Sequence, residues 1–213
     1  MPKVIAINGS PRKNANTVTL LQKTLDGAAS TGAKTEMIHL VDLQYKGCIS
    51  CFACKRKNMK HKDICALQDD LTPILEKVMD SDAVILGSPI YLGDVTALTR
   101  AFIERLGFVN VSYDGKKGNI FNGKINAAFI YTMNVPRPLS ALFTYIYKLN
   151  TGILKKLNGK VKQLVCTDTW QFDDYSNYNT ANFNVAKKEK ARKDLFPKDC
   201  YKAYQIGAMI SEK

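Results

Sequence analysis

The residues best suited to chemistry are a polar loop near the N-terminus and a cluster of cysteines. The loop, residues 8–17, reads Asn-Gly-Ser-Pro-Arg-Lys-Asn-Ala-Asn-Thr and leads from an apolar run into a helical pattern. Ser10, Asn16 and Thr17 supply hydroxyl and amide groups beside a helix N-terminus, where free backbone N–H groups and the helix dipole attract phosphate. Arg12 can neutralise the phosphate charge. The loop therefore predicts a phosphate site, although a strand-to-helix loop with ordinary capping residues and no ligand has a similar composition.

The glycine spacing of this loop separates it from two common nucleotide motifs. The loop contains neither the G-x-G-x-x-G pattern of dinucleotide-binding folds nor the G-x-x-x-x-G-K-[ST] pattern of P-loop enzymes. Both of those motifs hold the phosphates of larger nucleotides. A monophosphate is therefore the ligand that this loop fits better.

Four of the six cysteines, Cys48, Cys51, Cys54 and Cys65, fall within residues 48–65. Such close spacing indicates metal or redox chemistry instead of a disulfide framework. Three alternatives stay open at this point: a [4Fe–4S] cluster held by four thiolates, a structural zinc ion, and free or redox-active thiols in an ordered loop. The ten residues between Cys54 and Cys65 make the last gap wide for a compact cluster motif.

Net charge and hydropathy indicate which classes of partner the protein can bind. The net charge is +12, and its densest basic stretches are residues 55–62 and 187–193. Neither stretch is interleaved with aromatic residues as in a base-stacking surface. We therefore expect no nucleic-acid partner and favour a surface that steers anionic ligands. No apolar run approaches the roughly 20 residues that span a bilayer. The N-terminus has no signal-peptide pattern, so we expect a cytoplasmic protein.

The elements that must position these residues follow from apolar periodicity. Strands are predicted at residues 3–8, 34–40, 83–87, 124–131 and 161–167, and helices at 17–29, 71–79, 95–106, 138–157 and 183–210, the last interrupted near Pro197. Alternating strands and helices predict a parallel sheet with its ligand at the carboxyl ends of the strands. We expect one domain over residues 1–213, with a cysteine-containing insertion at about 44–69.

Two loops carry a family resemblance. The pattern Gly-Ser-Pro-Arg-Lys-x-x-Asn-Thr at residues 9–17 resembles the phosphate loop of the NAD(P)H-dependent FMN reductase and iron–sulfur flavoprotein group of flavodoxin-like proteins. Residues 87–93, Gly-Ser-Pro-Ile-Tyr-Leu-Gly, resemble the loop of that group that contacts the isoalloxazine ring. The cysteine spacing resembles the group's cluster motif. The resemblance implies a flavodoxin-like, doubly wound α/β fold, with five parallel strands in the order 2-1-3-4-5 and helices on both faces.

The resemblance also assigns site residues. The FMN phosphate would be held by Ser10, Arg12, Asn16 and Thr17. The flavin ring would be held by Pro89, Ile90, Tyr91, Leu92 and Gly93, with Thr132 and Met133 approaching from the other side. The four cysteines Cys48, Cys51, Cys54 and Cys65 would be the metal ligands. No catalytic side chain is predicted, because hydride chemistry belongs to the flavin and the protein supplies position and polarity.

The implied activity is that of an FMN-dependent NAD(P)H oxidoreductase, which passes hydride through the flavin to a quinone, a nitro or azo compound, free flavin or a similar small acceptor. Two alternatives stay open: an electron-transfer iron–sulfur flavoprotein with a [4Fe–4S] cluster at the cysteine loop, and a non-enzymatic FMN-binding module. By analogy with the group, we expect a homodimer or homotetramer, with residues 114–123 and 173–184 as candidate contacts.

Overall fold

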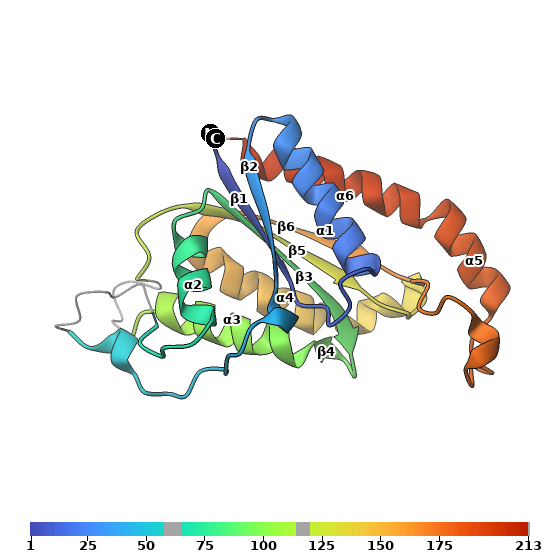
Figure 1. Ribbon diagram of the computed structural model, residues 1–213, viewed down its shortest axis with the longest axis horizontal. Helices are drawn as coiled ribbons and strands as arrows, with labels where there is room; N and C mark the ends of the chain where they lie inside the picture. Colours follow the sequence, from blue (N-terminus) through green and yellow to red (C-terminus); the bar gives the residue numbers. More distant parts are fainter. Residues whose placement is uncertain (58–64, 114–119, 213) are drawn as a thin grey trace.

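A parallel sheet forms the centre of the molecule in the computed structural model, which describes residues 1–57, 65–113 and 120–212 (Figure 1). Its strand order is β2-β1-β3-β5-β6. These strands are β1 (Lys3–Asn8), β2 (Lys34–His39), β3 (Ala83–Tyr91), β5 (Ile125–Thr132) and β6 (Asn158–Cys166). Because β5 and β6 are the fourth and fifth predicted strands, the expected order 2-1-3-4-5 is confirmed, and with it the flavodoxin-like α/β class.

The described residues contain one strand more than the five predicted. β4 (Asp94–Val95) pairs antiparallel with the end of β3, where Ile90 faces Val95. Leu92 and Gly93 connect the two strands with φ values of +50° and +94°, the left-handed region used by two-residue hairpin turns. A two-residue strand is too short to produce a hydropathy period, which is why the sequence did not predict it.

Alternation along the central strands fills a core on each face of the sheet. Ile5 and Ile7 lie in the cluster on one face, whereas Val4 and Ala6 lie in the cluster on the other. Strands buried on both faces explain the nearly continuous apolar runs in the sequence. The face of Ile5 is covered by α2 (Leu71–Met79), α3 (Ala97–Asn110) and α4 (Thr144–Leu154), and the face of Val4 by α1 (Asn16–Ser30) and α6 (Phe196–Ser211).

The helices α1 and α6 touch backbone to backbone. A Cβ added to Gly27 of α1 would lie 2.0 Å from the carbonyl oxygen of Tyr204, and one added to Gly207 of α6 would lie 1.8 Å from the carbonyl oxygen of Thr24. Two glycines therefore allow the N-terminal and C-terminal helices to lie side by side (Figure 1). The sheet face beneath them is closed by residues from both ends of the sequence.

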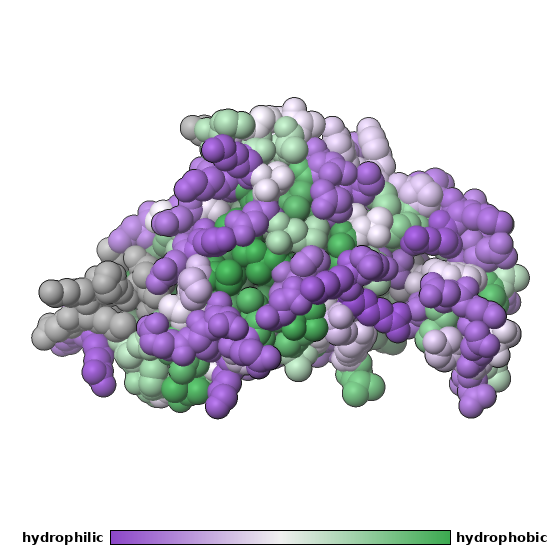
Figure 2. Space-filling view, in the orientation of Figure 1, coloured by the Kyte–Doolittle hydropathy of each residue, from purple (hydrophilic) through white to green (hydrophobic). Residues whose placement is uncertain are grey.

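The remaining elements lie at the edges. α5 (Val185–Asp194) is separated from α6 by Leu195, as expected from Pro197, and its outer surface is hydrophilic (Figure 2). Short 3-10 helices are η1 (Leu40–Asp42), η2 (Ala53–Lys55), η3 (Arg137–Phe143), η4 (Lys155–Leu157) and η5 (Tyr175–Asn177). The predicted helix 138–157 is thus divided into η3, α4 and η4. Among the described residues, no helix is long and apolar enough to cross a membrane.

Candidate functional site

The loop after β1 is bonded to the loop after β3. The N–H of Gly9 donates to the carbonyl of Gly87 at 2.8 Å, and the Thr96 hydroxyl donates to the carbonyl of Gly9 at 2.7 Å. A Cβ on Gly9 would lie 1.8 Å from Oγ1 of Thr99. Glycine is therefore required where the two predicted ligand loops meet at the carboxyl edge of the sheet.

Ser10 is held in place by its neighbours. Its N–H donates to Oδ1 of Asn8 at 3.0 Å, and its Oγ accepts the N–H of Arg12 at 3.1 Å. The side-chain amide of Asn8 also contacts Nδ1 of His39 at 2.9 Å. Because the Ser10 hydroxyl acts as an acceptor here, its proton is free to be donated to an anion within the loop.

The N-terminus of α1 fits a phosphate oxygen. Ala15 is the N-cap, and within the described residues no side chain caps this helix and no acidic residue stands in its first turn. The first N–H groups of a helix have no intrahelical partners. Thr17 is buried, and its Oγ1 lies 2.8 Å from Oγ1 of Thr132 at the end of β5. Thr17 and Thr132, two of the predicted cofactor contacts, therefore lie side by side at the ends of α1 and β5, and their role in binding a cofactor stays a prediction.

Arg12 and Asn16 are turned toward the segment that follows β6. Arg12 donates from Nη1 to the carbonyl of Gln171 at 2.7 Å, and Asn16 donates from Nδ2 to the carbonyl of Trp170 at 2.7 Å. Between this segment and α1 lies a cavity of about 400 Å³. Its lining residues are Arg12, Asn14, Ala15, Asn16, Thr19, Trp170, Gln171, Phe172, Asp173, Tyr178 and Arg192.

Arg192 of α5 is a cavity residue that the sequence did not single out. Its Nη1 donates to Oδ1 of Asn16 at 2.9 Å. In the sequence, Arg192 belongs to the basic stretch 187–193, whose composition is typical of a solvated helix surface. A contact between residues 176 positions apart has no local sequence pattern, so no signal in the sequence could have found it.

The ring loop is the β3–β4 hairpin. Pro89 and Ile90 are half-buried, whereas Tyr91 is 48% exposed and Leu92 is fully exposed. The N–H of Thr96 donates to Oγ of Ser88 at 3.1 Å and fixes the base of the hairpin. The hairpin therefore presents an apolar and aromatic surface beside the phosphate loop, which suits a planar ring.

Met133 lies inside the protein. Its side chain is 3% exposed, its sulfur accepts a hydrogen bond from the Tyr147 hydroxyl at 3.8 Å, and its N–H donates to the carbonyl of Cys166. Burial raises the pKa of Tyr147 to about 12, so this phenol stays protonated at neutral pH. A contact between Met133 and the flavin ring stays a prediction. Thr132, one residue earlier, faces the phosphate loop.

The four clustered cysteines line one small apolar cavity of about 20 Å³, together with residues of α3. Residues 58–64 of the predicted insertion lie outside the described residues. Among the residues that the structure describes, no group of three or more His, Cys, Asp or Glu side chains is arranged to hold a single metal ion. Four thiols around a common cavity are still the donor set that a [4Fe–4S] cluster requires.

Arg105 lines this cavity, and a second positive charge, beside Cys54, comes from Lys55. Its ammonium group donates to the carbonyls of Phe108 and Val111 at the end of α3. Burial, the largest effect, raises the pKa of the Cys54 thiol, and Lys55 opposes that rise. A positive group beside a thiol favours its ionised, ligand form.

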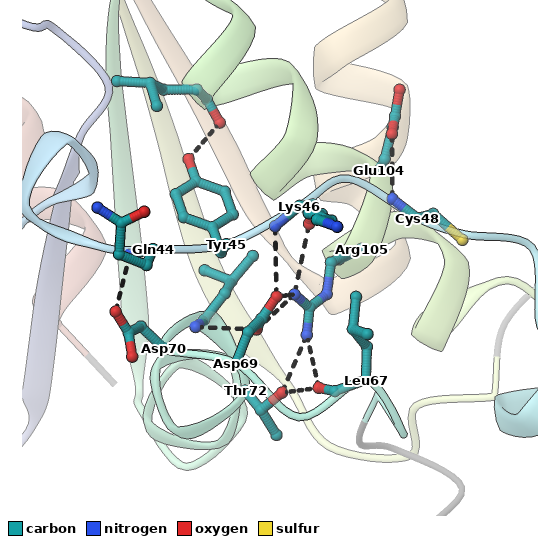
Figure 3. A network of polar contacts seen from close by, with 12 residues as sticks. Gln44, Tyr45, Lys46, Cys48, Leu67, Asp69, Asp70, Thr72, Glu104 and Arg105 are labelled. Carbon is teal, nitrogen blue, oxygen red and sulfur yellow. Dashed lines mark hydrogen bonds and ion pairs between the residues drawn. The ribbon is translucent and has the colours of Figure 1, made fainter.

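Both flanks of the cysteine loop are bonded to α3, one through Arg105 and the other through Glu104 (Figure 3). Arg105 pairs with Asp69, and its Nη2 donates to the carbonyl of Leu67 at 3.1 Å and to the Thr72 hydroxyl at 2.9 Å. On the other flank, the N–H of Cys48 donates to Glu104 at 3.2 Å. Burial acts to raise the pKa of Asp69, but hydrogen bonds from Arg105 and from backbone N–H groups outweigh it and leave that pKa below its ordinary value.

A comparison of the whole sequence with family models identifies the family. Residues 2–144 match the model of the NADPH-dependent FMN reductase family. The chain belongs to this family. The resemblance found in the two loops is therefore confirmed, and the match ends before β6, α5 and α6.

Relatives of this FMN reductase family member include proteins named for iron and sulfur. An iron–sulfur flavoprotein of Archaeoglobus fulgidus is 38% identical over 152 residues, 71% of each chain. An iron–sulfur flavoprotein of Methanocaldococcus jannaschii is 40% identical over 103 residues, 48% of this chain and 51% of that one. The chain thus spans about half the length of several curated relatives that it matches.

Solved structures share the fold over nearly the whole chain. An NAD(P)H:quinone oxidoreductase from Methanothermobacter marburgensis has a TM-score of 0.64 at 12% identity and covers 100% of this chain and 98% of its own. An FMN-dependent NADH-azoreductase from Bacillus anthracis, solved in complex with FMN, has a TM-score of 0.64 at 9% identity, with full coverage of both chains. These matches place the family member's β6, α5 and α6 in the same fold as the matched region.

Proposed function

We propose that this FMN reductase family member binds FMN at the carboxyl edge of its sheet and oxidises NADH or NADPH through it. The observation that carries the proposal is the junction at Gly9, which bonds the loop that leads to an uncapped helix N-terminus to the base of an exposed apolar hairpin. An anionic tail beside a planar aromatic ring is the ligand chemistry that this pair of surfaces fits.

Each loop has its own task. Ser10 and Thr17 would hold the phosphate with Arg12 and Asn16, and the hairpin from Pro89 to Gly93 would hold the ring. When bound, FMN supplies both the acceptor for hydride from the nicotinamide and the donor for the second substrate. The protein positions the two substrates in turn and needs no acid or base of its own. The exposed side chains of Tyr91 and Leu92 provide an apolar wall for a second planar molecule.

The apolar surface of Tyr91 and Leu92 indicates which class of electron acceptor could bind. A planar, mainly apolar molecule, such as a quinone, a nitro- or azo-aromatic compound or free flavin, would stack where the nicotinamide has left. Two structural neighbours are named a quinone oxidoreductase and an azoreductase, and quinones and azo compounds belong to this class. Exchange of two substrates at one place implies ping-pong kinetics.

The direct test is an anaerobic titration. Protein reconstituted with FMN should lose its flavin absorbance on addition of NADH or NADPH and should recover it on addition of a quinone. If FMN binds but neither NADH nor NADPH reduces it, the protein is a non-enzymatic FMN-binding module. Failure to bind FMN at all would overturn the proposal.

A second candidate function is single-electron transfer through a [4Fe–4S] cluster. The observation that favours it is the common cavity of Cys48, Cys51, Cys54 and Cys65, together with the names of the Archaeoglobus and Methanocaldococcus relatives. The four thiols would ligate the iron, and Lys55 would offset the cluster charge. Anaerobically prepared protein should then contain iron and labile sulfide and show a broad brown absorbance beneath the flavin bands. Absence of both elements would remove this function.

The protein is also proposed to form a homodimer or homotetramer. Large apolar side chains are exposed on η3 and α4: Leu139 at 51%, Leu142 at 78%, Tyr145 at 72% and Leu149 at 40%. The last three are spaced to share one side of the chain as it enters and follows α4. Apolar surface of this kind is typical of protein–protein contacts.

A further inference from the structure

Helix α5 presents two cations to the ends of the sheet. Lys188 and Arg192 are four residues apart and therefore lie on the same side of the helix. Lys188 is only 5% exposed, and its ammonium group donates to the carbonyl of Asn134, just beyond β5, at 3.1 Å. The same group lies 5.4 Å from the centroid of the Phe183 ring. A buried lysine with these contacts fixes the position of α5 on the loop that follows β5.

Arg192, one turn further along, reaches the phosphate loop. Its Nη1 donates to Oδ1 of Asn16, while Nδ2 of Asn16 donates to the carbonyl of Trp170. The guanidinium carbon also lies 4.0 Å from the centroid of the Phe196 ring. Both ends of the Asn16 amide are thereby fixed. A guanidinium has five N–H donors, and the bond to Asn16 uses one of them.

The lining of the cavity that Arg192 borders carries the charge of an anion site. Its lining includes two guanidinium groups, from Arg12 and Arg192, and one carboxylate, from Asp173. The side chains of Trp170 and Tyr178 supply aromatic walls. Two guanidinium groups on opposite elements match the planar, two-point recognition that phosphate oxygens favour.

We propose that Arg192, with Arg12 and Asn16, forms a subsite for a phosphate monoester. Arg192 comes from α5, which lies outside the residues that match the family model. This inference rests on the proposed function. Two ligands of that function have such a group: FMN, through its own phosphate, and NADPH, through its 2′-phosphate. Riboflavin and NADH are the corresponding molecules without that phosphate, so each source has a matched comparison.

The test compares Arg192→Gln with Lys193→Gln. Both variants remove one positive charge from α5, but the Lys193 side chain is 71% exposed and pairs only with Glu189 of its own helix among the described residues. Calorimetry would measure the binding of FMN, riboflavin, adenosine 2′-phosphate and adenosine to cofactor-free protein. Thermal unfolding of each variant would confirm that α5 stays folded.

The expected result is that Arg192→Gln weakens FMN or adenosine 2′-phosphate by about tenfold or more, the effect of one charge-assisted hydrogen bond. Its phosphate-free counterpart, and every ligand of Lys193→Gln, should stay within about twofold. Loss of FMN affinity assigns the subsite to the cofactor, and loss of adenosine 2′-phosphate assigns it to NADPH. If Arg192→Gln loses the same affinity for a phosphate ester and its phosphate-free counterpart, or loses none, the inference is overturned. In that case FMN binding by the parent protein still supports the proposed function. A parent protein that binds neither phosphate ester overturns both.

Discussion

Nη1 of Arg105 lies 2.6 Å from Oδ2 of Asp69, and this ion pair joins α3 to the segment that follows the cysteine loop. The side chain of Arg105 is fully buried and that of Asp69 is 14% exposed. Both oxygens of Asp69 accept hydrogen bonds from the same Nη1. The loop is therefore positioned by a buried charge, whose loss has consequences that can be measured.

Arg105→Met should lower the free energy of unfolding by about 3–5 kcal/mol, because it leaves the Asp69 carboxylate buried without its partner. Urea unfolding at neutral pH measures this change. The control is Lys77→Gln, which breaks an exposed ion pair with Glu36 and should cost no more than about 1 kcal/mol. Similar losses in the two variants would contradict the role given to Arg105.

The Asp69 pair also predicts a pH dependence. Since the folded pKa of Asp69 lies below its ordinary value, the charged carboxylate stabilises the fold at every pH above the unfolded value of about 3.9. That contribution is lost as the pH falls through the folded pKa. The difference in unfolding free energy between the parent protein and Asp69→Asn should thus be constant near neutrality and shrink in acid. A difference that grows in acid would show that the sign is wrong.

Gly9→Ala should weaken FMN binding and lower stability by about 1–3 kcal/mol, because the new methyl group overlaps the Thr99 hydroxyl. The double variant Gly9→Ala with Thr99→Ala removes the atom that lies 1.8 Å away and should recover part of both losses. Gly152→Ala has no atom within 4 Å of the new Cβ and serves as the neutral control. Flavin fluorescence titration and thermal melting report the two effects, and a double variant as impaired as Gly9→Ala would refute the steric explanation.

Cys54→Ser should abolish cluster incorporation if the second candidate function holds, because a hydroxyl is a poor replacement for a thiolate ligand. Iron and sulfide analysis of anaerobic protein is the measurement. Cys200→Ser is the matched control, since Cys200 lies in α6 against the opposite face of the sheet. Equal iron content in the two variants would exclude Cys54 as a ligand.

Leu142→Asp should shift the protein to a smaller species in light scattering coupled to size-exclusion chromatography, since it places a charge in the exposed apolar surface of η3 and α4. Tyr201→Asp makes a comparable change on α6, where Tyr201 is 64% exposed, and should leave the mass unaltered. If both variants keep the mass of the parent protein, the contact between subunits lies elsewhere.

The sheet and the two ligand loops could be predicted from the sequence because both follow from local patterns. Strands buried on both faces leave apolar runs, and turns at their ends need glycine and proline. Alternation along the chain also contained the signal that Met133 points inward: Phe129, Tyr131 and Met133 belong to one core cluster, so Met133 continues the inward series beyond the end of β5.

The contribution of α5 to the cavity between α1 and the segment after β6 could not be predicted from the sequence. Arg192 contacts Asn16 only because α5 packs beside the phosphate loop, and no hydropathy period or motif encodes that contact. Arg12 and Asn16 are similar cases. Their residue types predicted a phosphate site, but their bonds to the carbonyls of Gln171 and Trp170 depend on a segment more than 150 residues away.

The backbone contact between α1 and α6 has a consequence for biosynthesis. Because α6 covers the sheet face on which α1 packs, a nascent chain that lacks α6 exposes the apolar side of the helix whose N-terminus faces the phosphate loop. Docking of the α6 segment must therefore precede completion of the side of the cofactor site that α1 forms, and FMN loading should not begin before α6 has been synthesised.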